Sequence, residues 1–220
     1  MNAGDPPCYD YEHDPSAIYR RSFAIVRGEA DLARLPESLH PAAIRMIHAC
    51  GMPEIVADIA WRGDVAAVAA KALAAGAPVL ADVRMVCEGI IAKRLPANNS
   101  LVCTLNEPGV PDLAQRLGTT RSAAAVDLWA ERIEGAVVVI GNAPTALFHL
   151  LERIHQGFPR PAAILGFPVG FVGAAESKEA LLDSPLGIPC LVLRGRKGGS
   201  AIAAAALNAL AAGVPEETAS

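Results

Sequence analysis

His48 is the residue of this chain whose surroundings best suit acid–base chemistry. It lies in the segment IRMIHACG, where Arg45 comes one helical turn earlier, so both side chains project from the same side of a predicted helix. A cation beside an imidazole lowers the pKa of the imidazole unless an anion lies between the two groups. The pair therefore indicates either a catalytic histidine that works on an anionic ligand or a half-buried structural histidine.

Two more polar residues, Ser22 and Arg121, are placed where a ligand could use them. Ser22 interrupts the otherwise apolar face that Ile18, Ile25 and Val26 share in a predicted helix over 16–30. Its hydroxyl either bonds to the backbone carbonyl one turn earlier or points at a ligand. Arg121 follows two threonines that are typical of a helix N-terminus, where its positive charge opposes the helix dipole. It is therefore either a surface arginine or a cation placed to meet an anion.

The elements that must hold these side chains follow two patterns along the chain. The first part has helical patterns over 16–30, 39–50 and 64–75. Short, continuous apolar runs then alternate with helical stretches. The runs are 77–82, 100–105, 135–140, 161–165 and 188–193, and the helical stretches are 83–93, 113–132, 145–156, 174–182 and 199–212. Continuous apolar strands are buried on both faces, so the pattern predicts a three-layer α/β/α fold with a mostly parallel five-stranded sheet and a helical N-terminal region.

Polar residues gather where the predicted strands end. Ligands of open α/β sheets bind beyond the carboxyl ends of the parallel strands. The sequence has Thr104, Asn142 and Arg194 at these ends, together with the glycine-rich segments 166–173 and 194–200. We therefore expect a binding site at this edge. The glycines match neither GxGxxG nor GxxxxGK[ST], which disfavours a nucleotide, but helix N-termini after such loops bind other anions, including carboxylates.

The composition limits the class of protein. The chain has 220 residues, 52% of them hydrophobic and 19% charged, which excludes disorder for most of its length. It predicts one domain over 1–220, with tails at 1–8 and 213–220. The formal net charge of −4 argues against a nucleic-acid partner. No apolar run approaches the roughly 18 residues of a membrane span, and the acidic N-terminus does not have the pattern of a signal peptide.

The cysteines indicate a reducing environment. There are five, an odd number, and they form no CxxC pair and no metal-ligand spacing with histidine. This pattern predicts free thiols in the cytoplasm and no metal site.

Several longer segments resemble a known family. They include AIYRRSFAIVRGEADL, RMIHACG, AGAPVLADVRMVCEGI, GTTRSAAAVDLW and PAAILGFPVGFVGAAESKEAL. In this order, from about residue 9 to residue 210, the chain resembles the precorrin-8X methylmutase family, also called precorrin isomerases. The stretch 52–68 departs from the family pattern.

The resemblance implies a flavodoxin-like fold and a homodimer whose site lies near the subunit interface. It implies one reaction of cobalamin biosynthesis, in which a methyl group migrates from carbon eleven to carbon twelve of precorrin-8X to give hydrogenobyrinate, with no external cofactor. Anaerobic relatives act on the cobalt complex, and both substrates remain alternatives here. By the same resemblance, His48 would be the general acid, and Ser22 and Arg45 would contact the substrate.

Such a substrate is a flat tetrapyrrole ring bearing several carboxylates, so a net acidic protein would need local cations and helix N-termini to bind it. Arg121, Thr104, Asn142 and Arg194 are the further candidates for these contacts. Two other classes remain open: a tetrapyrrole carrier without catalysis, and a flavodoxin-like nucleotide- or flavin-binding protein. Turnover that needs His48 would distinguish the enzyme from the carrier. A flavin or NAD absorbance spectrum would support the nucleotide-binding protein.

Overall fold

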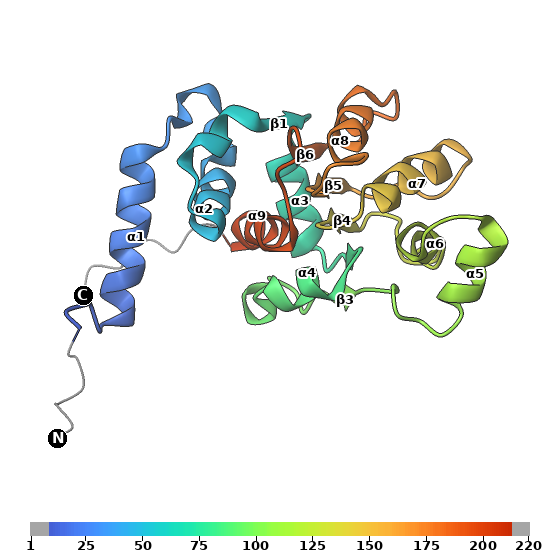
Figure 1. The fold of residues 1–220 in the computed structure, drawn as a ribbon, viewed down its shortest axis with the longest axis horizontal. Helices are drawn as coiled ribbons and strands as arrows, with labels where there is room; N and C mark the ends of the chain where they lie inside the picture. Colours follow the sequence, from blue (N-terminus) through green and yellow to red (C-terminus); the bar gives the residue numbers. More distant parts are fainter. Residues whose placement is uncertain (1–8, 213–220) are drawn as a thin grey trace, which may run out of the picture.

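The computed structural model of this chain describes residues 9–212, and the two predicted tails, 1–8 and 213–220, lie outside the described residues. Within 9–212 the chain forms a sheet with helices on both faces (Figure 1). In the same range no helix is long and apolar enough to cross a membrane. The cysteines described there are free thiols, namely Cys50, Cys87, Cys103 and Cys190.

The sheet in the described chain has six strands in the order β1-β6-β5-β4-β2-β3. The bounds are β1 (Ile59–Arg62), β2 (Val79–Ala81), β3 (Leu101–Val102), β4 (Val137–Ile140), β5 (Ala163–Gly166) and β6 (Cys190–Leu193). Neighbouring strands are parallel except for β1, which pairs antiparallel with β6 and places Ile59 opposite Leu193. The strand order reverses between β2 and β4, because the chain goes outward from β2 to β3 and then returns past β2 to β4. The predicted mostly parallel α/β sheet is confirmed.

β1 is the strand that the sequence did not predict, so within residues 9–212 the sheet has six strands instead of five. It lies at the edge of the sheet and follows the 3-10 helix η3 (Pro53–Asp58). Of its residues only Ile59 is fully buried. A half-buried edge strand has no continuous apolar run, which is the pattern that identified the other strands.

The helices agree with the predicted ones except in two places. They are α1 (Pro15–Glu29), α2 (His40–Cys50), α3 (Val65–Ala74), α4 (Arg84–Gly89), α5 (Val110–Leu117), α6 (Arg121–Asp127), α7 (Pro144–His155), α8 (Ala174–Asp183) and α9 (Ser200–Ala212), with 3-10 helices η1 (Leu32–Arg34), η2 (Glu37–Leu39), η3 and η4 (Ala92–Arg94). The single helix predicted over 113–132 is two, because Gly118 ends α5 with a left-handed φ of 61° and Thr120 caps α6. The stretch 83–93 contains both α4 and η4.

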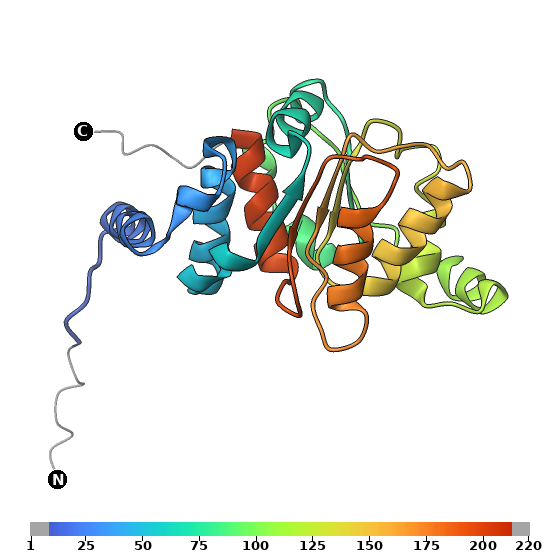
Figure 2. The same cartoon turned by 90° about the horizontal axis from the view of Figure 1, so that it is seen from above.

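Successive strand residues point to opposite faces of the sheet, and each face has its own core. Val79 and Val137 pack in the core that contains residues of α2, α3, α4 and α9. Leu80, Val138 and Ile164 pack in the core that contains residues of α6, α7 and α8. The result is the predicted arrangement of three layers, which is also visible from above (Figure 2).

α1 lies outside these layers, at one end of the molecule, and packs chiefly on α2 (Figures 1 and 2). Phe23 and Val26 face inward and are buried. The sequence placed Ile18, Ile25 and Val26 on one face with Ser22. Of these only Val26 is buried, whereas Ile18 and Ile25 are 48% and 49% exposed, because α2 covers the side of α1 that carries Phe23 and Val26.

Candidate functional site

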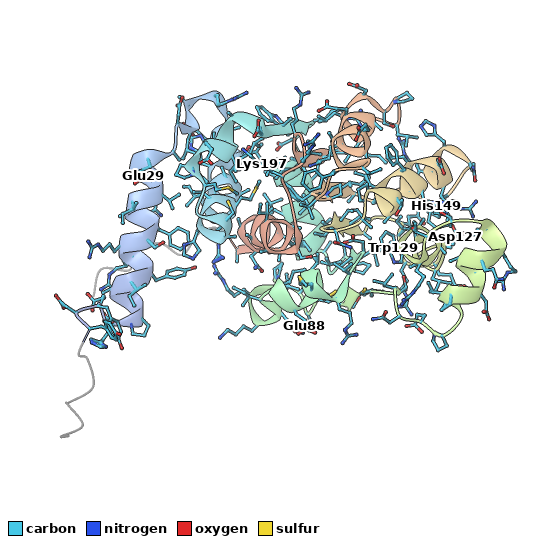
Figure 3. All side chains as sticks on the ribbon, in the orientation of Figure 1. Glu29, Glu88, Asp127, Trp129, His149 and Lys197 are labelled. Atoms are coloured by element: carbon cyan, nitrogen blue, oxygen red, sulfur yellow. The ribbon has the colours of Figure 1, made fainter. Side chains whose placement is uncertain are left out.

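The side chains of Ser22 and His48 meet between α1 and α2, where side chains fill the space between the helices (Figure 3). Ser22 lies in the middle of α1, and His48 lies in the last turn of α2, which ends at Gly51 with a left-handed φ of 70°. The distance between Ser22 Oγ and His48 Nδ1 is 2.9 Å, a hydrogen bond. Two roles were expected for the Ser22 hydroxyl, a bond to the backbone of its own helix or a contact with a ligand. In the structure the hydroxyl bonds to the imidazole of His48 in α2.

Two aromatic residues of α1 fix the plane of the His48 ring. Phe23 stacks on the imidazole, with ring centroids 4.7 Å apart and planes 22° apart. Tyr19 packs edge-on, with centroids 5.7 Å apart and planes 69° apart. Because Nδ1 is bonded to Ser22, Nε2 is the ring nitrogen without a hydrogen-bond partner among residues 9–212. This nitrogen is available to exchange a proton with a ligand.

The pKa of His48 lies below the ordinary value for histidine. Burial against the neighbouring rings is the larger cause, and the positive charge of Arg45 is the second. Part of the His48 side chain nevertheless remains exposed to solvent. An anion bound near both groups would raise the pKa of His48 again.

Arg45 is a buried cation with no acidic side chain in contact within the part of the chain described. Its side chain is only 6% exposed, and burial lowers its pKa. Nη2 donates a hydrogen bond to the hydroxyl of Tyr19 over 3.0 Å, while Nε is buried without a partner. Buried charges are normally paired with an opposite charge. This environment therefore suits an anionic group brought by a ligand.

Tyr19 and Phe23 are members of this cluster that sequence analysis did not identify. Both belong to the segment YRRSF, in which Tyr19, Ser22 and Phe23 are spaced to lie on one side of a helix. The spacing was visible in the sequence. Nothing in the sequence, however, indicated that this side would face the helix that carries His48 and not the core.

Thr104 and Arg121 both belong with α6, which packs on the opposite face of the sheet from α2 (Figure 1). Thr104 is buried, and its hydroxyl donates to the carbonyl of Ala125 over 2.7 Å. Arg121 is exposed, and its Nη2 donates to the side-chain oxygen of Asn106 over 2.9 Å. In the single chain both side chains hold the segment that follows β3 against α6.

Asn142 and Arg194 follow β4 and β6 at the carboxyl edge of the sheet. Asn142 has an exposed side chain, and its backbone N–H donates to the carboxylate of Asp82 over 3.0 Å. Arg194 is exposed, with its Nη2 3.4 Å from Oε2 of Glu179. The structure therefore brings together the candidates from α1 and α2 and distributes the other four around the sheet.

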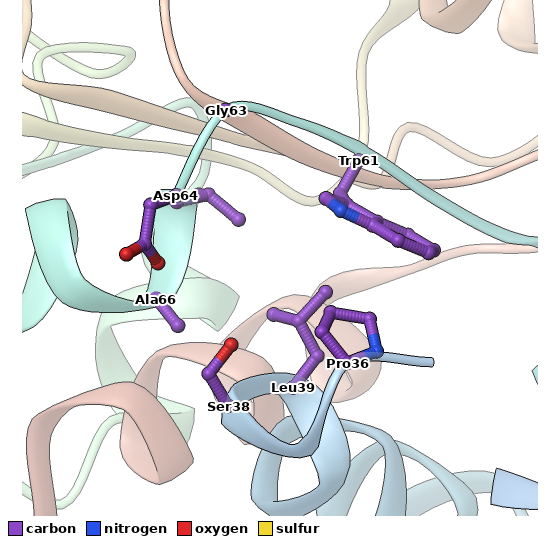
Figure 4. A pocket seen from close by; sticks show the side chains of 8 residues that line it. Pro36, Ser38, Leu39, Trp61, Gly63, Asp64 and Ala66 are labelled. Atoms are coloured by element: carbon purple, nitrogen blue, oxygen red, sulfur yellow. The ribbon is translucent and has the colours of Figure 1, made fainter. Parts of the chain in front are cut away.

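Three cavities lie near the N-terminal helices but do not include His48, and the smallest of them, of about 220 Å³, has Arg34 and Arg194 in its lining. One of about 310 Å³ lies between η2, β1 and the start of α3, with Trp61 and Asp64 among its lining residues (Figure 4). Another, of about 520 Å³, is lined by residues of the segments 29–34 and 53–57, which include three carboxylates and one arginine. Neither of these two larger cavities has an excess of cations in its lining, so neither suits a ligand with several carboxylates.

The strand order is that of flavodoxin-like α/β proteins, extended by β1, and comparison with known proteins places the chain among the enzymes of this class. A family model described as precorrin-8X methylmutase matches residues 17–212, and the chain belongs to that family. The resemblance found in the sequence is thereby confirmed. The enzyme is an isomerase, an intramolecular methyl transferase of cobalamin biosynthesis.

The relatives support this membership over almost the whole chain. A precorrin-8X methylmutase from Pseudomonas aeruginosa is 59% identical over 202 residues, which are 92% of this chain and 97% of the relative. A cobalt-precorrin-8 methylmutase from Salmonella typhimurium is 41% identical and covers 91% of this chain and 96% of its own. The crystal structure of a precorrin-8X methylmutase from Thermus thermophilus is similar with a TM-score of 0.81 at 42% identity, over 91% of this chain and 99% of that one.

Proposed function

We propose that this protein moves a methyl group from carbon eleven to carbon twelve of precorrin-8X, giving hydrogenobyrinate, and that His48 is the general acid. The observation that carries the proposal is the bond between Ser22 Oγ and His48 Nδ1, together with the stacking of Phe23 on the imidazole. These contacts hold the ring in one orientation and leave Nε2 for the substrate. A fixed imidazole is what general acid catalysis requires, because the donor must lie within hydrogen-bond reach of the atom that it protonates.

In this mechanism His48 donates a proton to the substrate and later takes a proton back. In the imidazolium form, Nδ1–H donates to Ser22 Oγ, and Nε2–H donates its proton to the conjugated ring of the substrate. Protonation makes the ring electron-poor and so facilitates the shift of the methyl group with its bonding electrons. Loss of a proton back to Nε2 then completes an isomerisation in which no proton is consumed. The bond to Ser22 keeps the other proton on Nδ1 throughout.

Arg45 and Tyr19 together provide the charge that the substrate carboxylates need. Arg45 is buried and donates to the Tyr19 hydroxyl oxygen, so the proton of that hydroxyl is left for a further acceptor. A carboxylate that accepts this proton would be stabilised by the charge of Arg45 behind it. It would also offset the effect of Arg45 on the pKa of His48, and so favour the protonated acid when substrate is bound.

We infer further that the enzyme is a homodimer and that the second copy completes the pocket. Two observations support this inference. His48 is partly exposed in the single chain, and Ile18 and Ile25 are about half exposed on the same helix as Ser22. Thr104 bonds to α6 and Arg121 begins it, and α6 packs on the opposite face of the sheet from the helix that carries His48, so a second copy is the simplest way for these residues to reach the same ligand.

The test of the proposed function is incubation of the purified chain with precorrin-8X, followed by a scan for the absorbance of the corrin product. His48→Ala is expected to reduce turnover by roughly a hundred- to ten-thousandfold while the tetrapyrrole still elutes with the protein on gel filtration. His155→Ala, which changes an exposed histidine at the end of α7, is the matched control and should turn over normally. A His48→Ala protein with a near-normal rate would remove His48 as the acid. Ring binding without turnover in the unmodified chain would identify a carrier instead.

A further inference from the structure

Asp82 fills the place where flavodoxin-like sheets usually bind their ligand. It follows β2 at the point where the strand order reverses, and it is 2% exposed. Its Oδ1 accepts from the N–H of Gly141 over 2.8 Å, and its Oδ2 accepts from the N–H groups of Asn142 and Ala143 over 3.0 and 2.7 Å. Such a group of backbone donors is an anion-binding site. Here the protein's own carboxylate occupies it, which argues against the nucleotide-binding alternative.

The loop that Asp82 holds is connected to the next two loops at this edge of the sheet. The carbonyl of Asn142 accepts from the N–H of Val169, over 3.3 Å. Gly170 N–H then donates to the carbonyl of Arg196 over 3.2 Å, and Gly199 N–H donates to the carbonyl of Phe167 over 2.9 Å. The segments 141–143, 167–173 and 194–199, called here the edge loops, are thus joined by backbone hydrogen bonds into one unit.

Lys178 holds the same unit from the opposite side. It lies in α8 and is fully buried, although the segment ESKE has the composition of an exposed helix. Its Nζ donates to the carbonyl of Lys197 over 2.7 Å. Burial lowers the pKa of this lysine to about 8, partly offset by the charges of Glu179 and Asp58. Lys197, labelled in Figure 3, has its Nζ 3.2 Å from the carboxylate of Asp58, the last residue of η3.

The edge loops 167–173 and 194–199 are in such close contact at Gly198 that no side chain fits between them. A Cβ added at Gly198 would collide with the carbonyl oxygens of Phe167 and Pro168. Backbone therefore lies directly on backbone at this point, and a glycine is required there. Loops packed in this way cannot shift independently of one another.

The edge loops expose apolar and cationic side chains to solvent. Phe171 is 83% exposed, and the guanidinium of Arg196 lies over its ring, 5.2 Å from the centroid. The side chains of Asn142 and Arg194 are exposed in the same loops, with Arg194 also paired to Glu179. An aromatic face with neighbouring cations complements a flat conjugated ring that bears carboxylates.

We propose that Asp82 and Lys178 are positioning residues that hold the edge loops in one arrangement for binding the tetrapyrrole. This inference rests on the proposed function. Buried charged side chains are an inefficient way to stabilise a fold, since apolar side chains of similar volume often do so as well or better. The hydrogen bonds of Asp82 and Lys178 go to the backbone of the edge loops, so these two side chains determine where the loops lie. Neither residue touches the substrate, and both act through the loops they hold.

The test uses Asp82→Asn and Lys178→Met in the full chain, with precorrin-8X as substrate and hydrogenobyrinate as the ligand for binding. Each variant is expected to raise KM and the product dissociation constant by about tenfold, with kcat changed less than about threefold, because the loss affects binding and not the acid. The double variant should be no worse than the more affected single variant, since both act on one unit. Asp127→Asn and Lys71→Met are the matched controls, because Asp127 bonds to His149 and Arg153 and Lys71 is exposed on α3. Both controls should leave KM unchanged.

Several results would overturn the inference. An unchanged KM with a lowered melting temperature would show that both residues only stabilise the fold. Additive increases of KM in the double variant would show that Asp82 and Lys178 do not act on one unit.

If Asp82→Asn does not fold, Asp82→Ala is measured in sodium formate, whose carboxylate fits the three N–H groups. Formate should then lower KM toward the wild-type value, whereas chloride at the same ionic strength should not, and no response to formate contradicts the proposal. Absence of turnover in the wild-type chain would instead contradict the proposed function.

Discussion

The guanidinium of Arg45 donates to the hydroxyl of Tyr19 across the boundary between α2 and α1, with 3.0 Å between Nη2 and the phenol oxygen. Tyr19 also packs edge-on against the imidazole of His48. One residue of α1 therefore contacts both the buried cation and the histidine. The position of the Arg45 guanidinium and the position of the His48 ring therefore both depend on Tyr19, at the contact between α1 and α2.

Replacement of Arg45 should weaken binding of the corrin product. Arg45→Ala removes a charge-assisted contact worth about 1.5–3 kcal/mol, which corresponds to about a ten- to hundredfold larger dissociation constant. Arg45→Lys should recover only part of the affinity, because an ammonium does not reproduce the planar guanidinium. Dissociation constants at fixed salt test this, with Arg27→Ala as a control that removes an exposed charge from α1. Wild-type affinity in Arg45→Ala would show that Arg45 does not serve the carboxylates.

The pH dependence of kcat/KM should follow the protonation of His48 in the free enzyme. The acid is active when protonated, so the rate falls as pH rises through its pKa, which lies below the ordinary value because of burial and then Arg45. Arg45→Gln removes the second cause only. It should therefore raise the pKa of His48 and move the falling limb to higher pH.

The pKa of His48 can be followed by NMR titration of its ring protons, in the wild type and in Arg45→Gln. His13 and His155 are exposed histidines in the same spectrum and serve as internal references. A downward shift of the His48 pKa in the variant, or no shift, would contradict the assignment of Arg45 as a cause.

Ser22→Ala should lower kcat by about three- to tenfold, because one hydrogen bond worth about 0.5–1.5 kcal/mol to the imidazole is lost. The effect is modest because Phe23 and Tyr19 still hold the ring. Single-turnover rates with precorrin-8X measure it, and Ser16→Ala, at an exposed position of the same helix, is the control. In a His48→Ala background, Ser22→Ala should have no further effect, whereas an equal loss in both backgrounds would mean that Ser22 acts independently of His48.

The enzyme should be a homodimer at micromolar concentration, as measured by light scattering of the full chain. Ile25→Glu places a charge on the half-exposed face of α1 and is expected to favour the monomer with loss of turnover. Leu117→Glu, at a comparably exposed apolar position in α5, is the control and should leave the mass unchanged. An active monomer would contradict a pocket completed by the second copy.

The sequence predicted the central strands because each is a continuous apolar run buried on both faces, as Val137–Ile140 illustrates. It did not predict β1, whose half-buried residues carry no such signal. It also placed the break between α5 and α6 inside one helix, although Gly118 and Thr120 are the usual end and start signals.

At the candidate site, helical spacing predicted that Arg45 and His48 project to one side, and both contact α1. The exact partner face of α1 could not be derived, since the sequence grouped the buried Val26 with Ile18 and Ile25, which are half exposed, and did not single out Phe23. The burial of Lys178 could not be predicted for a different reason. A lysine between glutamate residues has the pattern of a solvated helix, and only tertiary packing shows that it is buried.

α1 packs chiefly on α2, and it brings the hydroxyl of Ser22 and the ring of Phe23 to an imidazole that belongs to another helix. Elements with few contacts open at a lower free energy than the whole domain unfolds. Detachment of α1 would therefore release His48 while the sheet and its two cores stayed intact. Under the proposed mechanism, catalysis would therefore depend on how firmly α2 and the second copy of the inferred dimer hold α1, and it would be lost below the temperature at which the sheet melts.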